Sequence, residues 1–368
     1  MADYYVSTKS LSVGYNGVSL IRDISIGVSR GQILTLIGPN GAGKSTILKS
    51  IIRQLAPVAG TVILQGKSMS TMTEKEISRV LSVLMTDRIR PELMTCRDVV
   101  STGRYPYTGR LGILSSRDWQ AVDEAMALVH AQELAGQSFD RISDGQRQRI
   151  LLARAICQEP EIIVLDEPTS FLDVRHKLEL LSILKKMVRE RNVAVIMSLH
   201  ELDLAQRISD MLVCVRGDTI HRVGTPEEIF RGDEIAKLYG ITKGSFNPDF
   251  GSVELEPPKG APEIFVIGGG GSGIGVYRQL QRLSIPFAAG VLAENDLDYP
   301  VAAALAGQVV SVPAFALADE AAAEQAKAVI DRCRRVICCP EVFGPANQGN
   351  LLLRDYAAGK LCTAEDLK

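Results

Sequence analysis

Long apolar stretches and concentrations of one charge are both missing from this 368-residue sequence. No apolar run approaches the roughly 18–20 residues that a helix needs to cross a bilayer. The net charge is −2 and the lysines and arginines form no block, which argues against a basic surface for DNA or RNA. The opening letters MADYYVSTK lack the charged and then apolar layout of a secretory signal. We therefore expect a cytosolic protein that binds no nucleic acid, although it could still dock on a membrane protein.

Cysteines and aromatic residues are also few. The seven cysteines show no paired spacing, and the cluster Cys333, Cys338 and Cys339 has neither the two-residue gaps nor the nearby histidine of a zinc site. We expect neutral thiols there. The remaining composition, 46% hydrophobic and 23% charged, is typical of a soluble globular protein. The length suggests about two domains.

Apolar, β-rich runs alternate with helical ones along the chain, which predicts an α/β fold. Residues 33–38, 161–166 and 193–199 are nearly continuous apolar runs, as in central parallel strands that are buried on both faces. Residues 4–35 alternate more like an antiparallel edge sheet. These patterns predict a layered core with an antiparallel part at its N-terminus.

The character of the sequence changes at residues 242–262, where spaced glycines and prolines show no helical period. After this stretch come the strand-like segments EIFVIG, AAGVL, VVSV and VICC, with alanine-rich helical segments between them. This pattern indicates a small Rossmann-like unit. We predict a first domain over residues 1–241, a linker over 242–262 and an accessory domain over 263–368.

A phosphate-binding loop is predicted at residues 38–45, GPNGAGKS, which fit G-x-x-x-x-G-K-[ST] between a strand and a helix. The glycines let backbone N–H groups surround a phosphate, Lys44 adds a positive charge, and the Ser45 hydroxyl can bind Mg²⁺. The predicted ATP-binding residues of this loop and the helix start are Gly38, Pro39, Asn40, Gly41, Ala42, Gly43, Lys44, Ser45 and Thr46.

Two carboxylates end the apolar run at 162–168, IIVLDEP. We predict that Asp166 binds the same Mg²⁺ as Ser45, and that Glu167 is the general base that activates water. His200 follows another apolar strand, so it should lie at the same sheet edge and contact the terminal phosphate. Tyr15 is a candidate for stacking on adenine, with an exposed turn tyrosine as the alternative.

The phosphate loop, ISDGQ at 142–146, VLDEP, TSFLD and SLH occur in an order and spacing that resemble the ATPase subunit of ABC transporters, over about residues 4–240. The resemblance implies a P-loop ATPase with a RecA-like core, an antiparallel β subdomain and a helical subdomain. It also implies that two copies pair head-to-tail around two ATP molecules. The residues that would contact the partner's ATP are Ser143, Asp144, Gly145 and Gln146, and Asp173 matches the D-loop at that interface.

Two positions depart from the family pattern. Asp144 stands where the family usually has glycine, and we expect its carboxylate to face solvent or the partner. The glutamine of the family's Q-loop falls on Thr86, so Thr86 and Asp87 become the candidates for contact with Mg²⁺ or water.

Residues 98–109, DVVSTGRYPYTG, resemble the segment of importers for iron–siderophore, haem and cobalamin-type chelates that meets the membrane subunit. Tyr105, Pro106 and Tyr107 would form a stiff amphipathic turn with Arg104 beside it, suited to an interface anchor, and the alternative is a loop packed on its own helical domain. The resemblance implies ATP hydrolysis coupled to import, two transmembrane permease subunits, an extracytoplasmic binding protein acting indirectly, and a place on the cytoplasmic face of the inner membrane.

A second glycine-rich loop, VIGGGGSGIG at 266–275, contains G-x-G-x-x-G at Gly268, Gly270 and Gly273. With Glu294 or Asp296 in the place of a ribose-binding acid, it could hold a nucleotide-like ligand. No catalytic His, Lys or Cys constellation is evident over 263–368, so ligand sensing, dimer reinforcement and a vestigial enzyme all stay open.

Two further readings compete with the importer. A soluble ABC-type ATPase of repair, translation or cluster assembly would have no membrane partner, and the GRYPY segment argues against it. An enzyme whose main activity lies in the C-terminal domain is disfavoured by the missing catalytic groups.

Overall fold

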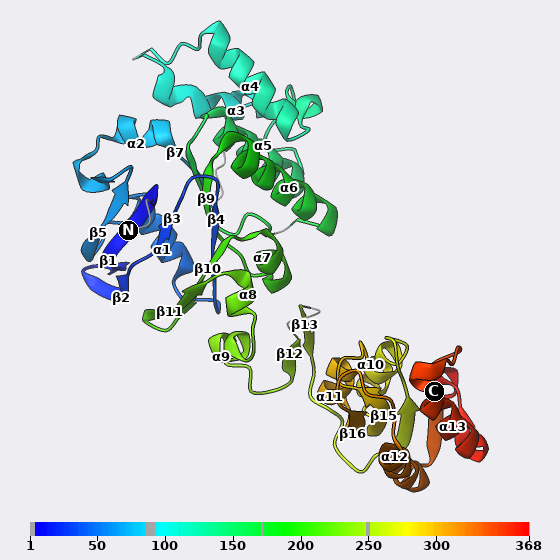
Figure 1. The fold of residues 1–368 in the computed structure, drawn as a ribbon. Coiled ribbons are helices and arrows are strands. Elements are labelled where there is room, and N and C mark those ends of the chain that lie inside the picture. The colour runs from blue at the N-terminus through cyan, green and yellow to red at the C-terminus, as the bar shows by residue number, and fades with distance from the viewer. Residues whose placement is uncertain (1–3, 86–92, 110, 171, 248–250, 368) are drawn as a thin grey trace. The chain divides into compact units, whose positions relative to one another are not determined.

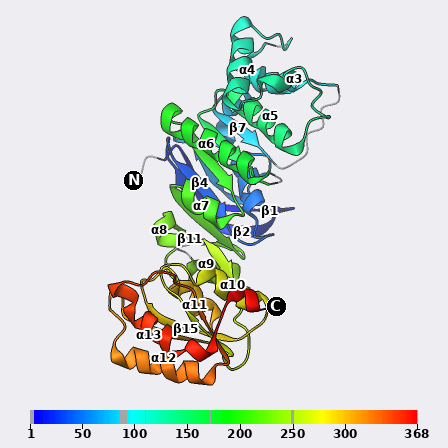
Figure 2. The ribbon, with the colours of Figure 1, turned by 90° about the vertical axis from the view of Figure 1, so that its right-hand side faces the viewer.

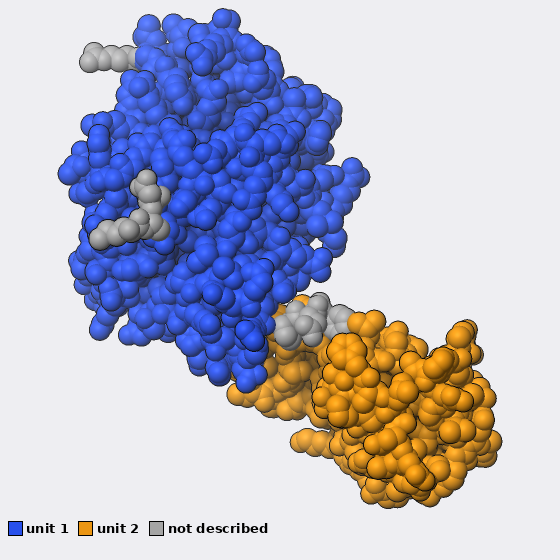
Figure 3. Space-filling view, viewed as in Figure 1, with its two compact units in different colours: residues 1–239 blue, residues 240–368 orange. Residues whose placement is uncertain are grey.

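The computed structural model describes residues 4–85, 93–109, 111–170, 172–247 and 251–367. The chain divides into two compact units, residues 1–239 and 240–368, which Figure 3 draws in two colours. Each unit has its own sheets and its own apolar core, so each is described by itself. No helix among the described residues is both long and apolar enough to cross a membrane.

The central sheet of unit 1 has six strands in the order β11-β10-β4-β9-β8-β7. All neighbouring pairs are parallel except β10 with β11, which forms an antiparallel edge. Every residue of β4, β8 and β9 is buried, which explains why these strands are continuous apolar runs in the sequence. The strand bounds are β4 Ile33–Ile37, β7 Leu81–Leu84, β8 Ile162–Leu165, β9 Ala194–Ser198, β10 Met211–Arg216 and β11 Thr219–Gly224.

A second, antiparallel sheet lies over one face of the central sheet. Its strands are β1 Val6–Tyr15, β2 Val18–Ile24, β3 Gly27–Val28, β5 Ala59–Leu64 and β6 Lys67–Ser68. Helix α1 (Lys44–Ile51) shares one continuous apolar core with both sheets. On the opposite side, α6 (Val174–Arg191) contacts β9 and α7 (Leu202–Ile208) contacts β4 (Figure 2). The first helix is thereby fixed between two sheets.

A helical subdomain extends from the core, where α3 and α4 pack on α5 (Figure 1). Three of its helices begin with a capping box, in which Thr95, Ser115 and Ser143 accept the N–H of the third helical residue. The α-helices here are α3 Cys96–Ser101, α4 Ser116–Leu128 and α5 Asp144–Cys157, with the 3-10 helices η2 Thr102–Tyr107 and η3 Gln132–Leu134. Elsewhere in unit 1 are η1 Met69–Thr71, α2 Glu74–Val80, α8 Pro226–Ile229 and α9 Glu234–Tyr239. The predicted class, a P-loop ATPase core with antiparallel and helical subdomains, is confirmed.

Unit 2 contains a five-stranded parallel sheet in the order β16-β15-β14-β17-β18. The strand order reverses between β14 and β17, as in Rossmann-like folds. Helices α12 and α13 pack on one face, while α10 and α11 pack on the other. The strands are β14 Ile264–Ile267, β15 Phe287–Ala293, β16 Gln308–Val312, β17 Arg335–Cys338 and β18 Leu361–Cys362. The helices are α10 Ile274–Arg282, α11 Tyr299–Leu305, α12 Glu320–Arg332 and α13 Gln348–Tyr356, with η4 Pro345–Asn347, η5 Ala358–Lys360 and η6 Ala364–Asp366.

The predicted linker over 242–262 needs a correction, because part of it is folded. Strands β12 (Ser245–Asn247) and β13 (Ser252–Glu254) form a two-stranded hairpin that contacts α11. The Glu254 carboxylate is buried and forms an ion pair with Arg278 of α10. The glycines and prolines leave no periodic pattern in this part of the sequence. The hairpin is stabilised by its contacts with the rest of unit 2, and the local sequence does not show these contacts.

Candidate active site

The predicted phosphate loop connects β4 to α1, at the carboxyl end of a buried central strand. Gly43 precedes the helix with φ +92°, and a Cβ there would lie 2.5 Å from Ile21 Cδ1. Only glycine fits this position without strain. The loop therefore brings the start of α1 and its free backbone N–H groups to one place, which suits a phosphate.

Lys44 lies inside this loop and is 4% exposed. Its Nζ donates to the carbonyl oxygens of Gly38 at 2.7 Å and Pro39 at 3.1 Å. Burial lowers the pKa of the Lys44 ammonium, and the charges of Glu167 and Asp166 oppose that shift. An ammonium in so dry a place, beside the start of a helix, is a strong partner for phosphate oxygens.

The predicted magnesium ligands meet across the sheet edge. Ser45 Oγ donates to Asp166 Oδ1 at 3.0 Å, and the Asp166 side chain follows β8 and is buried. One carboxylate and one hydroxyl, completed by phosphate oxygens and water, fit the ligands that Mg²⁺ takes in nucleotide sites.

Glu167 and His200 also come together at this edge. His200 Nε2 and Glu167 Oε1 form a hydrogen bond, and Ser170 Oγ donates to Glu167 Oε2 at 3.2 Å. Glu167 has φ +48°, which a non-glycine residue adopts only under strain. The strand end therefore holds Glu167 in an uncommon backbone conformation, with its carboxylate bound by His200 and Ser170.

The signature turn starts helix α5. Ser143 Oγ accepts the Gln146 N–H at 3.3 Å, and Gln146 Oε1 accepts the Ser143 N–H at 2.9 Å. Gly145 has room, with no atom closer than 3.7 Å to an added Cβ. Asp144 is exposed and binds Arg147 at 2.7 Å, so its carboxylate turns along its own helix. Because Ser143 Oγ acts as an acceptor in the cap, its hydrogen is left for another acceptor.

Four other predicted residues have different outcomes. Asp173 caps α6 by accepting the His176 N–H at 2.9 Å, and that bond lowers the pKa of its carboxyl group. Tyr15 is 52% exposed at the end of β1, and its hydroxyl lies 3.4 Å from Thr46 Oγ1, so the ring stands beside the phosphate loop. Thr86 and Asp87 lie outside the described residues.

Sequence reasoning missed Ser198, the last residue of β9. Its Oγ donates to Asp166 Oδ1 at 2.7 Å and accepts the Glu167 N–H at 2.9 Å. It thus fixes both predicted carboxylate residues relative to each other. A serine that ends an apolar strand two residues before His200 was the available signal.

Tyr239, at the end of α9, was also missed. Its hydroxyl oxygen accepts the N–H of Gly38, the first residue of the phosphate loop, at 3.1 Å. Burial raises the pKa of this hydroxyl to about 12, so it stays neutral at ordinary pH. The two residues are about 200 positions apart, and only the tertiary structure joins them.

Tyr239→Phe should lower the free energy of unfolding by about 1–3 kcal/mol, because the Gly38 N–H loses its buried acceptor. It should also weaken ATP binding, which depends on the same loop. Thermal unfolding and fluorescent-nucleotide titration would measure both effects, with Tyr4→Phe, at a half-exposed ring, as the control. Identical behaviour of the two variants would refute the role of Tyr239.

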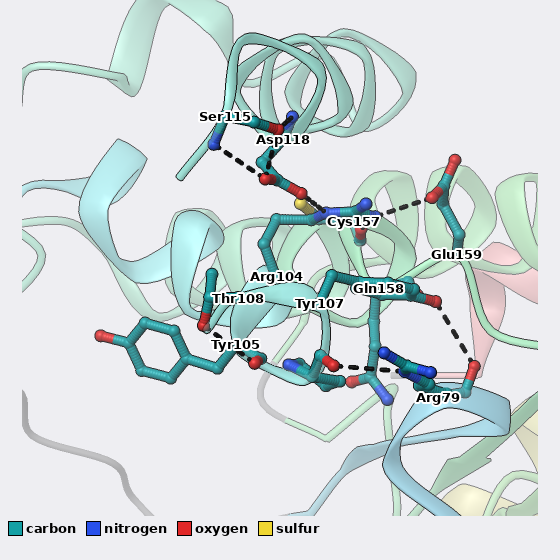
Figure 4. Close-up of polar contacts among 11 residues, drawn as sticks. Arg79, Arg104, Tyr105, Tyr107, Thr108, Ser115, Asp118, Cys157, Gln158 and Glu159 are labelled. Atoms are coloured by element: carbon teal, nitrogen blue, oxygen red, sulfur yellow. Dashed lines mark hydrogen bonds and ion pairs between the residues drawn. The ribbon is translucent and has the colours of Figure 1, made fainter. Parts of the chain in front are cut away.

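The segment expected to be an interface anchor behaves as two parts (Figure 4). Arg104 is 3% exposed and binds Asp118 at 2.9 Å and Glu159 at 2.8 Å, while its Nη1 also donates to the Cys157 carbonyl. Arg104 is thus an internal residue of its own helical subdomain, as in the alternative interpretation. A cation inside three packed segments needs several partners, and these supply them.

The two tyrosines of this segment differ. Tyr107 stacks on the Arg104 guanidinium at 4.1 Å, and its hydroxyl donates to the Gln158 carbonyl at 2.9 Å. Tyr105 is 58% exposed, and its ring points away from the polar cluster (Figure 4). The alternative of a loop packed on its own domain thus applies to Tyr107, and Tyr105 alone offers an exposed aromatic side chain.

Four N–H groups of the second glycine-rich loop are bound by carboxylates of the chain itself. Asp298, which is fully buried, accepts the N–H groups of Gly269, Gly273 and Ile274, and Asp296 accepts that of Gly270 at 2.9 Å. Glu294 is exposed on the surface. These bonds argue against the nucleotide interpretation of Gly268, Gly270, Gly273 and Glu294, because carboxylates of the chain itself accept N–H groups of the loop.

Comparison with known proteins agrees with this geometry. Residues 21–170 match the family model described as ABC transporter, and residues 287–366 match the MJ0874 family. An uncharacterized ABC transporter ATP-binding protein, MJ0873 of Methanocaldococcus jannaschii, is 40% identical over 78% of this chain and 100% of its own length. The chain belongs to the ATP-binding proteins of ABC transporters.

Other relatives carry more specific names. The cobalamin import ATP-binding protein BtuD of Halobacterium salinarum is 32% identical over 87% of this chain and 82% of its own length. The probable siderophore transport system ATP-binding protein YusV of Bacillus subtilis is 35% identical over 64% of this chain and 86% of its own length. Among solved structures, cbiO1 from Clostridium perfringens shares the fold, with a TM-score of 0.55 and 23% identity over 68% of this chain and 98% of that chain.

Proposed function

We propose that this protein is the ATP-hydrolysing subunit that powers a membrane importer for a metal chelate of the iron–siderophore, haem or cobalamin kind. The observation that carries the catalytic part is the meeting of Ser45, Asp166, Glu167 and His200 beside the phosphate loop. The chelate class is supported by the relatives named for siderophore and cobalamin transport.

At this site the chain positions groups and offsets charge. Lys44 would contact the β- and γ-phosphate oxygens, and Ser45 with Asp166 would hold Mg²⁺, which neutralises charge on the phosphates. Glu167 would take a proton from the attacking water. His200, hydrogen-bonded to Glu167, would orient that carboxylate and reach the terminal phosphate. Ser198 would keep Asp166 and Glu167 in register.

We propose that the ATP bound to one chain is also contacted by a second copy of the chain, paired head-to-tail with the first. Ser143 is exposed at the start of a 14-residue helix, where backbone N–H groups and the helix dipole favour an anion. Its hydroxyl hydrogen is free to bind a phosphate oxygen of the partner's ATP. Asp144 would not repel that phosphate strongly, because its charge is paired with Arg147. Asp173 would lie at the same interface.

Tyr105 is our candidate for the contact with a permease subunit. Arg104 holds the segment rigidly from inside, so the exposed ring would dock with little loss of entropy. The carbonyl that Arg104 binds belongs to Cys157, the last residue of α5, while Ser143 caps the other end of the same helix. A movement of the docked permease could thereby reach the ATP-contacting end of α5.

The test is co-purification of the protein from native membranes, with identification of its partners. We expect two transmembrane permease subunits to co-purify with this protein, which would sit on the cytoplasmic face of the inner membrane. Recovery without any membrane subunit would favour a soluble ATPase and refute the transport proposal.

Tyr105→Ala should reduce the recovery of permease about tenfold or more, since buried aromatic anchors carry much of the energy of an interface. The matched control is Leu178→Ala, which removes an exposed apolar side chain from a different element, helix α6. Quantitative mass spectrometry of the purified complex gives the ratio. Equal recovery with both variants would contradict the assignment of Tyr105.

A further inference from the structure

Unit 2 contains a cavity of about 790 Å³ at the carboxyl ends of its parallel strands. Its walls come from the ends of β15 and β16, from the loops that follow β14, β15, β16 and β17, and from η4 and α13. Ligands in open α/β sheets bind at this edge, next to the point where the strand order reverses. The volume lies within the range of about 300–1,000 Å³ that is usual for small-molecule sites. Position and size therefore mark a ligand site, independent of the chemistry in unit 1.

Two asparagines of the cavity, Asn350 and Asn347, are already engaged with the protein. Asn350 donates to the carbonyl oxygens of Gly268 and Val291 at 3.1 Å and accepts the Val291 N–H at 3.1 Å. Asn347 accepts from Gly344 at 2.7 Å and donates to Val342 at 3.2 Å. These amides hold strand ends and loops together through both their oxygen and their nitrogen atoms. The amides of Asn350 and Asn347 therefore serve the fold first, and the Asn295 oxygen accepts the Phe315 N–H.

The glycine-rich loop contributes no anion site either. As described above, Asp298 and Asp296 occupy the N–H groups of Gly269, Gly270, Gly273 and Ile274. Asp296 is also the one charged side chain among the described residues that line the cavity. A phosphate would meet this carboxylate and would find neither a lysine nor an arginine in the lining. The electrostatics thus disfavour nucleotides and other anions.

Apolar side chains make up the rest of the site and its rim. Phe315 is 88% exposed, Val342 82% and Leu317 62%, and all three line the cavity. Phe315 has φ +64°, and its N–H is fixed by Asn295 Oδ1 at 2.8 Å. The strained backbone and the exposed ring of Phe315 both lower the stability of the folded protein. Such an unfavourable arrangement is typical of a side chain that binds a ligand.

We propose that unit 2 binds, in this cavity, a small organic molecule that is largely apolar and carries no negative charge. Shape and apolar contact would supply the affinity, and Asp296 would exclude anions. This site would let the transporter subunit respond to a molecule other than ATP.

Nile red, an uncharged apolar fluorophore, is the probe for the full chain. Wild type should bind it saturably, with a rise in fluorescence. Ala346 is an exposed residue of the cavity lining, and the tryptophan ring of Ala346→Trp would fill part of the cavity. This variant should weaken the binding of Nile red at least about tenfold, or about 1.4 kcal/mol. Ala328→Trp, which adds the same ring on the exposed face of α12 outside the cavity, should leave the Kd within about twofold. Phe315→Ala, at the rim, should also weaken binding and guards against a folding defect in the first variant.

Competition decides the charge preference. In a Lys44→Ala background, which disables the phosphate loop of unit 1, excess ADP-ribose or inorganic phosphate should not displace Nile red. Displacement by either anion, absence of saturable binding to wild type, or equal affinities of Ala346→Trp, Phe315→Ala and Ala328→Trp would overturn the proposal.

Discussion

Glu167→Gln should bind ATP with nearly unchanged affinity and hydrolyse it about 10²–10⁴ times more slowly, the usual contribution of a general base. The amide keeps the shape and can still hydrogen-bond His200, but it cannot accept a proton from water. Because the terminal phosphate stays in place, closed dimers should accumulate. Single-turnover hydrolysis and size-exclusion chromatography with ATP measure the two effects.

The conservative change at a neighbouring acid sharpens this test. Asp166→Asn removes a predicted Mg²⁺ ligand, so it should weaken the magnesium dependence of binding, whereas Glu167→Gln should leave that dependence intact. Normal hydrolysis by Glu167→Gln would show that another group activates the water, with His200 as the next candidate.

Ser143→Gly should lower turnover about 10²–10³-fold, the usual cost of removing one donor to a developing charge. Glycine is a good substitute, because as an N-cap it costs the helix only a few tenths of a kcal/mol, about the least of any residue that lacks the hydroxyl. ATP should still bind to the phosphate loop of the same chain, but ATP-dependent dimers should be lost. Ser143→Thr keeps the hydroxyl and should retain most of the activity.

Mixing two inactive variants tests where that hydroxyl acts. In a head-to-tail dimer, a Ser143→Gly copy and a Lys44→Ala copy form one site with an intact phosphate loop and an intact signature turn. Random pairing should restore up to about a quarter of wild-type turnover, because half of the dimers are mixed and each has one complete site. If both variants are inactive alone and no activity returns on mixing, the contact in trans is refuted.

Much of the active site is readable from the sequence because its parts are local. The phosphate loop depends on the backbone geometry of nine consecutive residues, so its glycines, Lys44 and Ser45 predict it directly from the sequence. Asp166, Glu167 and His200 were predicted together because buried parallel strands bring their carboxyl ends to one edge. The structure confirms the fold that this reasoning required, including the Rossmann-like order of unit 2.

The failures share a cause, which is that a side chain's partner lies far away in the sequence. Arg104 stands beside the predicted interface anchor in the sequence, but its ion pairs with Asp118 and Glu159 hold it inside the helical subdomain. The glycines at 268–273 matched a nucleotide motif, but Asp298 reaches them from 25 to 30 positions away. The motif predicts the backbone conformation of the loop. It does not predict whether a ligand or another part of the chain binds the N–H groups of that loop.

The sequence by itself determined the class of fold, the phosphate loop and the identity of the predicted catalytic groups, because strand periodicity and loop chemistry are properties of consecutive residues. Only the tertiary structure decided that Ser198 and Tyr239 support the site, that Tyr105 is the exposed residue of its segment, and that the second glycine loop is filled by the protein's own carboxylates. Burial and hydrogen-bond pairing depend on which distant segments meet, and that information exists only once the chain has folded.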